Sequence, residues 1–310
     1  MLTLSVVVIS YNSSSFLEKN IRSLLGQSKK FKQIIIVDNN STDNSREIIK
    51  EYDEVSLVAP GQNVGYAAGA NLGISECRSD LILVANSDIY LESDFNENVI
   101  SKFEEDRKIS LLSPLILRFD KMIVDSAGQM FSRSLYPVEI GFNRDKNKLD
   151  IKERSVFSVC GAATVFRKNA LEKLKVENEY YDEAFFMFWE DFDIGWRANL
   201  YGMKTIMSPT AIVYHFRGGT LKKNFTTRFS MALSRSPEIK YHLIKNRYLT
   251  LIKNFRFKKF WYLIPFMIFK DIIWVGMLTM SSPKIIIKLF SSGGFIISAF
   301  RKRKIIKKNE

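Results

Sequence analysis

The sequence predicts an α/β protein in which a mainly parallel central sheet is covered by helices on both faces. Two observations predict this class: short β-branched apolar runs recur through the first half of the chain, and stretches of helical periodicity separate them. The 310 residues are enough for one large domain or two modest ones with a sizeable core.

The first strands of the sheet are predicted from four apolar runs, at residues 4–9, 33–38, 55–58 and 81–85. After the first run, Ser15 and Glu18 have capping-box spacing, and the apolar residues that follow keep helical period up to Gly26. A glycine-bearing loop at 63–73 continues into a helix of small residues. Between Arg118 and Phe157 periodicity breaks down, and we expect a long mobile loop there.

Polar side chains follow three of these runs at the point where each strand ends. They are Ser10–Asn12, Asp38–Asn40 and Asn86–Asp88. Open α/β sheets bind ligands in the crevice outside the carboxyl ends of their strands. A single cluster of this kind is more often a strand-end turn, but three equivalent clusters indicate one shared ligand. Asp38 could accept a hydrogen bond from a pyrimidine N–H, and Asp88 could hold a ribose or a divalent cation.

A second acidic group stands in the aromatic stretch 185–197. Glu190, Asp191 and Asp193 lie among Phe and Trp residues, where burying a charge is costly unless it is paired or used. If a helix begins at Glu190, its dipole favours these acids in the first turn, and Arg197 lies on the same face as Asp193. The stretch alone fits an ordinary acidic helix start as well as a catalytic site.

Positive charge is concentrated at the C-terminal end of the chain. The net charge is +13, but residues 217–310 carry +18 and residues 1–216 carry −5. The basic part is also rich in Phe, Trp, Ile and Leu, which suits an anionic membrane surface better than a solvated basic face. Nucleic acid is excluded as a partner because the strand-end acids would repel phosphate and the aromatic runs lack an RNA-binding signature.

Two apolar segments in this region, 260–269 and 272–278, are separated by Lys270 and Asp271. A central charged pair is expensive in hydrocarbon, so an interfacial helix pair is favoured over a spanning hairpin. A helical subdomain that packs on the enzyme or forms a homodimer is the alternative.

Features of the N-terminus and the cysteines favour a cytosolic protein. The chain starts without a basic lead or a small-residue cleavage site, so no signal peptide is predicted. Cys77 and Cys160 have no metal-ligand spacing and are expected to be reduced thiols.

The ordered set of motifs resembles family 2 glycosyltransferases of the GT-A fold, specifically their bacterial rhamnosyltransferase-like branch. The matching segments cover about residues 4–216: VVISYN at 7–12, IIVDNNSTD at 35–43, NVGYAAG at 63–69, ANSD at 85–88, CGAA at 160–163, WEDFD at 189–193 and YH at 214–215. This resemblance implies inverting transfer of a sugar from a nucleoside diphosphate to an acceptor hydroxyl.

Roles for individual residues follow from the resemblance. It implies Asp191 as the catalytic base, with Glu190 as the second choice. The residues expected to bind the donor are Ser10, Tyr11, Asn12, Asp38, Asn40, Asn63, Gly65, Asn86, Ser87 and Asp88. Those expected to contact the acceptor or the diphosphate are Trp189, Arg197 and Arg217. The family's usual DxD element stands here as Asn86-Ser87-Asp88, so Mg²⁺ or Mn²⁺ is expected at Asp88, with His215 as a further ligand.

These observations predict a GT-A domain at residues 1–220 and a basic, amphipathic helical region at 221–310 that associates with the membrane. The predicted donor is a dTDP- or UDP-linked sugar, with dTDP-rhamnose suggested by the branch. The predicted acceptor is a glycan or a polyprenyl-diphosphate-linked sugar in cell-surface polysaccharide synthesis, at the cytoplasmic face of the plasma membrane. A UDP-hexose transferase of the same fold and a catalytically weak scaffold subunit remain as alternatives, and a homodimer stays open.

Overall fold

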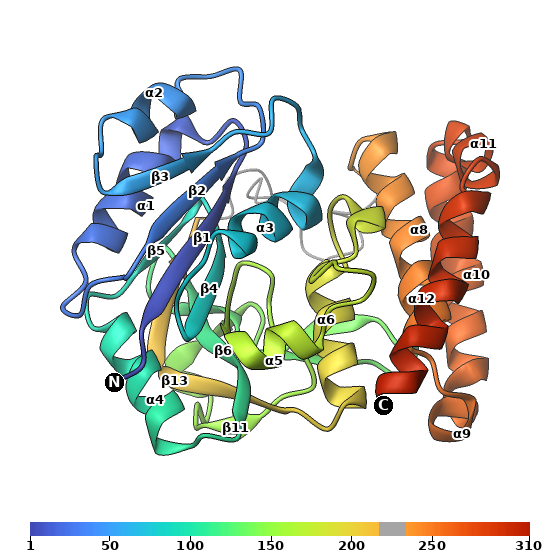
Figure 1. Cartoon of the computed structure of the whole chain (residues 1–310). Helices are drawn as coiled ribbons and strands as arrows, with labels where there is room; N and C mark the ends of the chain where they lie inside the picture. The colour runs from blue at the N-terminus through green and yellow to red at the C-terminus, as the bar shows by residue number, and fades with distance from the viewer. Residues whose placement is uncertain (217–233) are drawn as a thin grey trace.

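The computed structural model describes residues 1–216 and 234–310, and shows a sheet between layers of helices with a further group of helices beside it (Figure 1). The parallel part of the sheet has the order β4-β1-β2-β3. Its strands are β1 (Leu4–Ser10), β2 (Ile34–Asp38), β3 (Val55–Val58) and β4 (Leu81–Asn86). All four predicted runs are therefore confirmed as strands, to within one residue at each end.

Beyond β4 the sheet becomes mixed. β12 (Ala163–Arg167) pairs antiparallel with β4 and with β6 (Ile109–Arg118), and β6 continues to β7 (Ile123–Ser126) and β10 (Arg144–Asp145). The long strand β13 (Lys204–His215) runs parallel to β6 and antiparallel to β5 (Ile89–Leu91) and β11 (Arg154–Ser155). Strands β8 (Gln129–Phe131) and β9 (Pro137–Glu139) form a separate hairpin.

Alternating residues of β1 show that helices cover both faces. Leu4, Val6 and Val8 belong to the core beneath α1 (Ser14–Leu25), α2 (Ser45–Lys50) and α4 (Phe95–Glu105). Val7 and Ile9 point into the opposite core, beneath α3 (Gly65–Ser75), α5 (Lys168–Lys173) and α6 (Glu190–Leu200). This confirms the predicted fold class, because successive side chains of a strand face opposite sides of the sheet.

The start of α1 differs from the prediction. The helix begins at Ser14, with Ser13 as its N-cap, and the carbonyl of Ser13 accepts bonds from the N–H groups of Phe16 and Leu17. Asp43, from the loop after β2, accepts a bond from the Ser14 N–H at 3.0 Å. A distant carboxylate thus caps this helix, so the Ser15–Glu18 capping box is not used.

The segment between Arg118 and Phe157 is ordered, in contrast to the mobile loop that we expected. It forms β7 to β11 and the 3₁₀ helix η1 (Lys146–Lys148), with strands of two to four residues. β7, β10 and β11 extend the sheet, and β7 and β8 carry side chains to the site described below.

The C-terminal part of the chain is helical and packs directly on the sheet domain (Figure 1). Its helices are α8 (Pro237–Asn254), α9 (Phe257–Phe260), α10 (Ile264–Ser281), α11 (Lys284–Phe290) and α12 (Gly293–Asn309), with the 3₁₀ turn η3 (Trp261–Leu263) before α10. Leu249 of α8 and Ile306 of α12 share one apolar core with Phe192 and Trp196 of α6. Trp274 and Leu278 of α10 pack with Tyr241 and Ile244 of α8.

Among the described residues, one helical segment is long and apolar enough to cross a membrane. It covers Phe257–Ser281. A stretch of 18 residues within it has a mean hydropathy of 1.7, and only 17% of that stretch is buried. Asp271 lies within it, but on the side that faces the protein. Its carboxylate accepts bonds from Arg247 at 2.7 Å and 3.1 Å and from the Tyr136 hydroxyl at 2.9 Å.

Candidate active site

A cavity of about 420 Å³ opens at the carboxyl ends of β1, β2 and β4. Of the ten residues predicted to bind a donor, seven line it. They are Tyr11, Asn12, Asn63, Gly65, Asn86, Ser87 and Asp88, and the other lining residues are Ile9, Ser13, Phe16, Asn39, Tyr66, Phe186 and Met187. We call this the strand-end cavity.

Hydrogen bonds between the strand-end loops fix the floor of the cavity. Asn12, with φ 48°, accepts a bond from the Thr42 N–H at 2.8 Å, and its own N–H donates to Ser41 at 2.9 Å. Ser13 and Ser87 join the loops after β1 and β4 through a hydroxyl–hydroxyl contact of 2.7 Å. The three loops are therefore one interlocked unit, because each is bonded to another.

Three predicted donor contacts lie outside the lining of this cavity. Asp38 is fully buried, and its carboxylate accepts bonds from Ser41 and from Arg46 Nε at 2.5 Å. Asn40 holds the same arginine at 3.2 Å, and Ser10 is completely covered. Asp38 thus stabilises the loop after β2, and contact with a pyrimidine would require Ser41 and Arg46 to release it.

Asp88 forms a polar cluster with residues from two other strands. Its carboxylate lies 3.2 Å from Nε2 of His215, whose Nδ1 lies 2.8 Å from Asp125 of β7. Burial lowers the pKa of His215, but hydrogen bonds to Asp125 and Asp88 outweigh burial and raise that pKa to about 9. In this arrangement the imidazole is a cation between two carboxylates.

The same cluster has the donor types that a divalent cation needs. Among the described residues no group of three or more His, Cys, Asp or Glu side chains could hold a metal ion. Mg²⁺ is commonly held by one or two carboxylates together with phosphate oxygens of the substrate. Asp125 behind His215 also matches the carboxylate–histidine pairs that orient metal ligands. Asp88 and His215 therefore fit a cation shared with a diphosphate, provided the imidazole gives up its proton.

Asp191, in the first turn of α6, is held by three hydrogen-bond donors. They are the N–H of Gly161 at 2.8 Å, the N–H of Phe192 at 2.8 Å and the side-chain amide of Gln129 at 3.0 Å. A Cβ on residue 161 would come within 3.1 Å of the Asp191 carboxylate, so only glycine allows this approach without a shift. Gly161, in the CGAA segment at 160–163, thus admits a carboxylate close to the backbone.

The peptide at Gly161 connects Asp191 to the strand-end cavity. Tyr66, which lines the cavity, donates its hydroxyl to the Gly161 carbonyl at 2.9 Å, and the Asn86 N–H donates to the Ala162 carbonyl at 3.0 Å. Asp191 does not itself line that cavity. It is linked to Tyr66 through the backbone of Gly161 and is partly exposed.

Glu190 and Asp191 have different surroundings. Glu190 is 7% exposed, and one of its carboxylate oxygens has no hydrogen-bond partner among the described residues. Burial and the neighbouring Asp191 charge raise the pKa of Glu190 well above its ordinary value. Burial also raises the pKa of Asp191, but the three donors oppose this rise. The pair therefore favours a neutral Glu190 next to an ionised Asp191.

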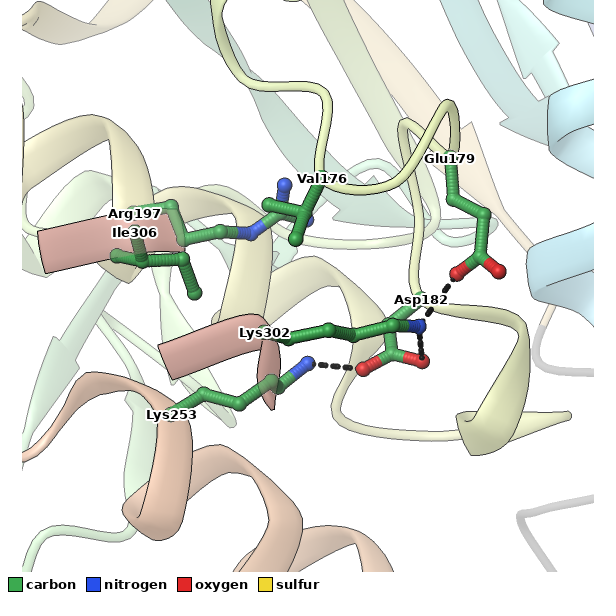
Figure 2. Close-up of a pocket in the computed structure, with 7 residues that line it drawn as sticks. All are labelled: Val176, Glu179, Asp182, Arg197, Lys253, Lys302 and Ile306. Carbon is green, nitrogen blue, oxygen red and sulfur yellow. Dashed lines mark hydrogen bonds and ion pairs between the residues drawn. The ribbon is translucent and has the colours of Figure 1, made fainter. Parts of the chain in front are cut away.

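Three residues were predicted to contact the acceptor or the diphosphate. Two of them lie elsewhere in the structure, and the third is outside the described residues. Arg197 is 2% exposed, and its guanidinium donates to Asp193 at 3.1 Å and to the carbonyls of Leu174 and Tyr180. Asp193 also pairs with Lys253, and Lys253 and Lys302 both pair with Asp182 (Figure 2). The structure therefore places Arg197 in a buried ion network and not where the predicted contact requires it. Trp189 is 6% exposed and packs edge-on against Tyr136, away from the cavity lining. Arg217 lies outside the described residues.

Residues 185–189, which we call the aromatic loop, lead into Glu190 and Asp191 with unusual backbone angles. Phe186, Phe188 and Trp189 have φ values of 64°, 66° and 74°. Such conformations cost on the order of 1–3 kcal/mol each in a residue with a Cβ, and persist only where the surroundings impose them. The carbonyl of Phe186 accepts bonds from the N–H groups of Tyr66 and Ala67 at the start of α3, at 2.6 Å and 3.4 Å.

Several residues of this site were not predicted from the sequence. Gln129 and Asp125 come from the segment that we expected to be a mobile loop, and no periodicity or motif marks them. Asn246, which contacts the aromatic loop from α8, is not among the predicted site residues either. These side chains reach the site through tertiary packing, and a pattern of local spacing does not report that.

The architecture is that of the GT-A glycosyltransferases. A mannosyltransferase from Pyrobaculum calidifontis, PcManGT, solved with GDP-Man and Mn²⁺, matches with a TM-score of 0.60 and 12% identity, over 99% of this chain and 86% of that one. S. aureus TarS 1–349, solved with UDP, matches with a TM-score of 0.58 and 14% identity, over 100% of this chain and 92% of that one.

The sequence identifies the family. The model of glycosyl transferase family 2 matches residues 5–175, which is more than half of the chain, and the protein belongs to that family. The chain is 26% identical to an N-acetylglucosaminyl-diphospho-decaprenol L-rhamnosyltransferase of Mycobacterium tuberculosis, over 69% of this chain and 76% of that protein. It is also 26% identical to a poly-beta-1,6-N-acetyl-D-glucosamine synthase of Staphylococcus aureus, over 68% of this chain and 49% of that protein. The predicted resemblance to rhamnosyltransferase-like members is confirmed.

Proposed function

We propose that this glycosyltransferase moves a sugar with inversion from a nucleoside diphosphate in the strand-end cavity to a hydroxyl held beside Asp191. The observation that carries the proposal is the peptide at Gly161. It bonds to the Asp191 carboxylate through its N–H and to Tyr66 of the cavity wall through its carbonyl. A donor in the cavity would therefore have a carboxylate close to its sugar end.

In the proposed mechanism Asp191 takes the proton from the acceptor hydroxyl as that oxygen attacks the anomeric carbon. The bond between the sugar and the diphosphate breaks on the opposite face, and the leaving diphosphate takes the electron pair. Three donors hold Asp191 in one orientation, which limits the rotamer search before attack. Glu190, kept neutral by burial, adds no second negative charge next to the base.

Asp88 and His215 are the residues that would hold Mg²⁺ or Mn²⁺ together with the diphosphate. The bound cation would supply Lewis-acid neutralisation of charge on the leaving group. Asn86 and Ser87, on the same turn, can donate hydrogen bonds to the donor from the cavity wall. Tyr11 lines the cavity with 49% of its surface exposed, which leaves its ring accessible to a nucleobase.

For the substrates, we propose dTDP-rhamnose as donor and a polyprenyl-diphosphate-linked glycan as acceptor, in cell-surface polysaccharide synthesis. The rhamnosyltransferase relative supports this choice by its name and by its coverage. The competing proposal is a UDP-hexose donor, which the poly-N-acetylglucosamine synthase relative supports.

We further propose that the enzyme works at the cytoplasmic face of the plasma membrane as a peripheral protein. Helices α9 to α12 expose many large apolar side chains in a strongly basic part of the chain, including Trp261, Phe269, Ile272, Ile287, Phe290 and Ile297. We call this the outer apolar face. Because Asp271 and Trp274 hold α10 along α8, the helix is arranged to lie on a membrane surface.

The experiment that tests this proposal is a panel of nucleotide sugars with Mg²⁺ or Mn²⁺, measured as transfer to a synthetic lipid-linked acceptor and as thermal stabilisation. Turnover with dTDP-rhamnose exceeding that with UDP-hexoses is the expected result. Turnover confined to UDP-hexoses would replace the donor, and binding of a nucleotide sugar without any turnover would favour the scaffold alternative.

A further inference from the structure

The aromatic loop is held from outside the sheet domain by α8, whose Asn246 binds its backbone and whose His242 stacks on the Phe186 ring. Asn246 is completely buried, and its amide nitrogen donates to the carbonyls of Phe185, Met187 and Phe188 at 2.9, 2.7 and 2.8 Å. The neighbouring Lys245 donates to the carbonyl of Ala184, just before the loop. Since the partners are all carbonyl oxygens, the position requires a donor.

The three carbonyls belong to the part of the backbone that is most strained. Phe186, Phe188 and Trp189 have positive φ. Phe188 is bonded to Asn246 directly, and Phe186 lies between Phe185 and Met187, which are both bonded to Asn246. Side-chain hydrogen bonds of this kind let a segment keep angles that the chain alone does not favour. Asn246 therefore selects the loop conformation.

Two consequences of this conformation reach the proposed chemistry. The loop carries Phe186 and Met187 into the wall of the strand-end cavity, and the Phe186 ring leaves no room for a Cβ on Gly65. At its other end the loop leads into Glu190 and sets the start of α6, and thus the place of Asp191. One side chain thereby fixes the cavity wall and the candidate base relative to each other.

The flanks of the loop are anchored separately, and Figure 2 shows the anchor of the first flank at Asp182. Asp182, before the loop, accepts bonds from Lys253 at 2.5 Å and Lys302 at 2.7 Å. Asp193, after the loop, is bonded to Arg197 and to Asn254. With both flanks held by ion pairs, loss of the Asn246 amide would release the middle of the loop and leave its ends in place.

We propose that Asn246 is a positioning residue for glycosyl transfer, which holds the aromatic loop in the conformation that places Asp191 against the strand-end cavity. This inference rests on the proposed function for its effect on turnover. Its effect on the loop does not depend on any activity. Helix α8 accordingly contributes a side chain that sets the geometry of the proposed active site.

The test compares Asn246→Ala with Asn96→Ala in the full-length protein. Asn96 is a matched control because it is also fully buried and donates its amide to one distant carbonyl, that of Lys29, at 2.7 Å. Both variants lose a buried amide. Hydrogen exchange, melting temperature, nucleotide binding and kcat are measured for each.

For Asn246→Ala we expect faster exchange of the Tyr66 and Ala67 amides, a kcat at least 30-fold lower and a nucleoside-diphosphate Kd within threefold of wild type. Asn96→Ala should lower the melting temperature but keep exchange at residues 65–67, and its kcat should stay within threefold. Asn246→Gln keeps the donor on a longer side chain, and it replaces the alanine variant if that variant does not fold.

Unchanged exchange at residues 65–67 in the Asn246 variant, or a kcat loss no larger than that of Asn96→Ala, would overturn the positioning role. Failure of the proposed function has a different signature. In that case the wild type transfers no sugar from any donor, while the exchange difference between the two variants remains.

Discussion

Glu190 and Asp191 are adjacent in the sequence, yet only one of them has donors arranged around it. Three N–H groups point at Asp191, whereas an oxygen of Glu190 has no hydrogen-bond partner among the described residues. An unpaired, buried carboxyl is far more stable in its neutral form. At the scale of single residues, these surroundings are the reason why we propose Asp191 and not Glu190 as the base.

The first prediction concerns Glu190→Gln. Because the pKa of Glu190 is raised, its neutral form dominates at pH 7, and glutamine copies that form. We expect kcat at pH 7 to stay within about fivefold of wild type. As pH rises, wild-type Glu190 ionises beside the base, so the variant should differ from wild type on the alkaline side only. Measuring kcat from pH 5 to 10 checks this, and a hundredfold loss at pH 7 would instead make Glu190 the base.

Part of the site could be predicted from residue patterns alone. Six residues of the three strand-end clusters line one cavity, because the ends of neighbouring parallel strands must meet at one edge of the sheet. The same rule could not tell that Asp38 turns toward Ser41 and Arg46, since that depends on the path of the following loop. The spacing of Arg197 from Asp193 placed both side chains on one helical face, and they form an ion pair there. The ligand contact of Arg197 came from the resemblance and not from that spacing.

At the scale of elements, buried ion pairs attach α8 and α12 to the loops that flank Asp191. Burial would raise the pKa of Asp182, but the charges of Lys253 and Lys302 outweigh burial and lower that pKa far below its ordinary value. A carboxyl whose pKa is lower in the folded state than in the unfolded chain stabilises the fold at any pH above its unfolded pKa. This contribution disappears as the pH falls through the pKa of the folded state.

The second prediction follows for Asp182→Asn. Removing one partner of a buried pair costs about 3 kcal/mol, so the variant should unfold at a clearly lower urea concentration at pH 7. The difference in unfolding free energy between the variant and wild type should stay constant above pH 5. It should shrink below about pH 4, where the carboxyl of Asp182 becomes protonated in the unfolded wild-type chain. The exposed pair of Glu105 with Lys102 gives the control, because Glu105→Gln should leave the urea midpoint unchanged. An equal difference at pH 3 and pH 7 would contradict this account.

Strands with short β-branched runs between polar loops were predictable, whereas the longer strands β6 and β13 were not among the predicted ones. Strands β1 to β4 have four to seven residues with β-branched runs, and the predicted ranges match them. The segment after Arg118 was missed because β8, β9, β10 and β11 have only two or three residues, too few for a period to be recognised. Their pairing partners are set by the sheet already formed, through tertiary contacts.

At the scale of the whole molecule, the C-terminal helices are joined to the sheet domain by polar contacts in its interior. Asp271 of α10 accepts a bond from the Tyr136 hydroxyl and pairs with Arg247 of α8, which donates to the Leu135 carbonyl, and Lys302 of α12 pairs with Asp182. Deletion of residues 255–310 would therefore leave charges unpaired and unmask the core shared with α6. A truncated protein is thus a poor test of membrane binding, and point changes on the outer apolar face are preferable.

The third prediction uses the double variant Phe269→Glu, Ile272→Glu, at positions that are 68% and 70% exposed. Two apolar side chains that enter a bilayer surface contribute about 1.5–3 kcal/mol each. We expect at least tenfold weaker binding to vesicles containing phosphatidylglycerol, with an unchanged melting temperature. Met122→Glu, at an exposed apolar position of the sheet domain, should bind like wild type. Unchanged vesicle binding together with a smaller sedimentation coefficient would show instead that a second copy covers this face.

The central claim is that the strand-end cavity holds a nucleotide sugar and that Asp191 takes the proton from the acceptor. The most direct measurement is Asp191→Asn, assayed by calorimetry for donor binding and by transfer to a lipid-linked acceptor. We predict that donor affinity stays within about threefold and that kcat falls by about 10²–10⁴, the contribution typical of a positioned base. Transfer within tenfold of wild type, or donor binding lost together with transfer, would contradict the account.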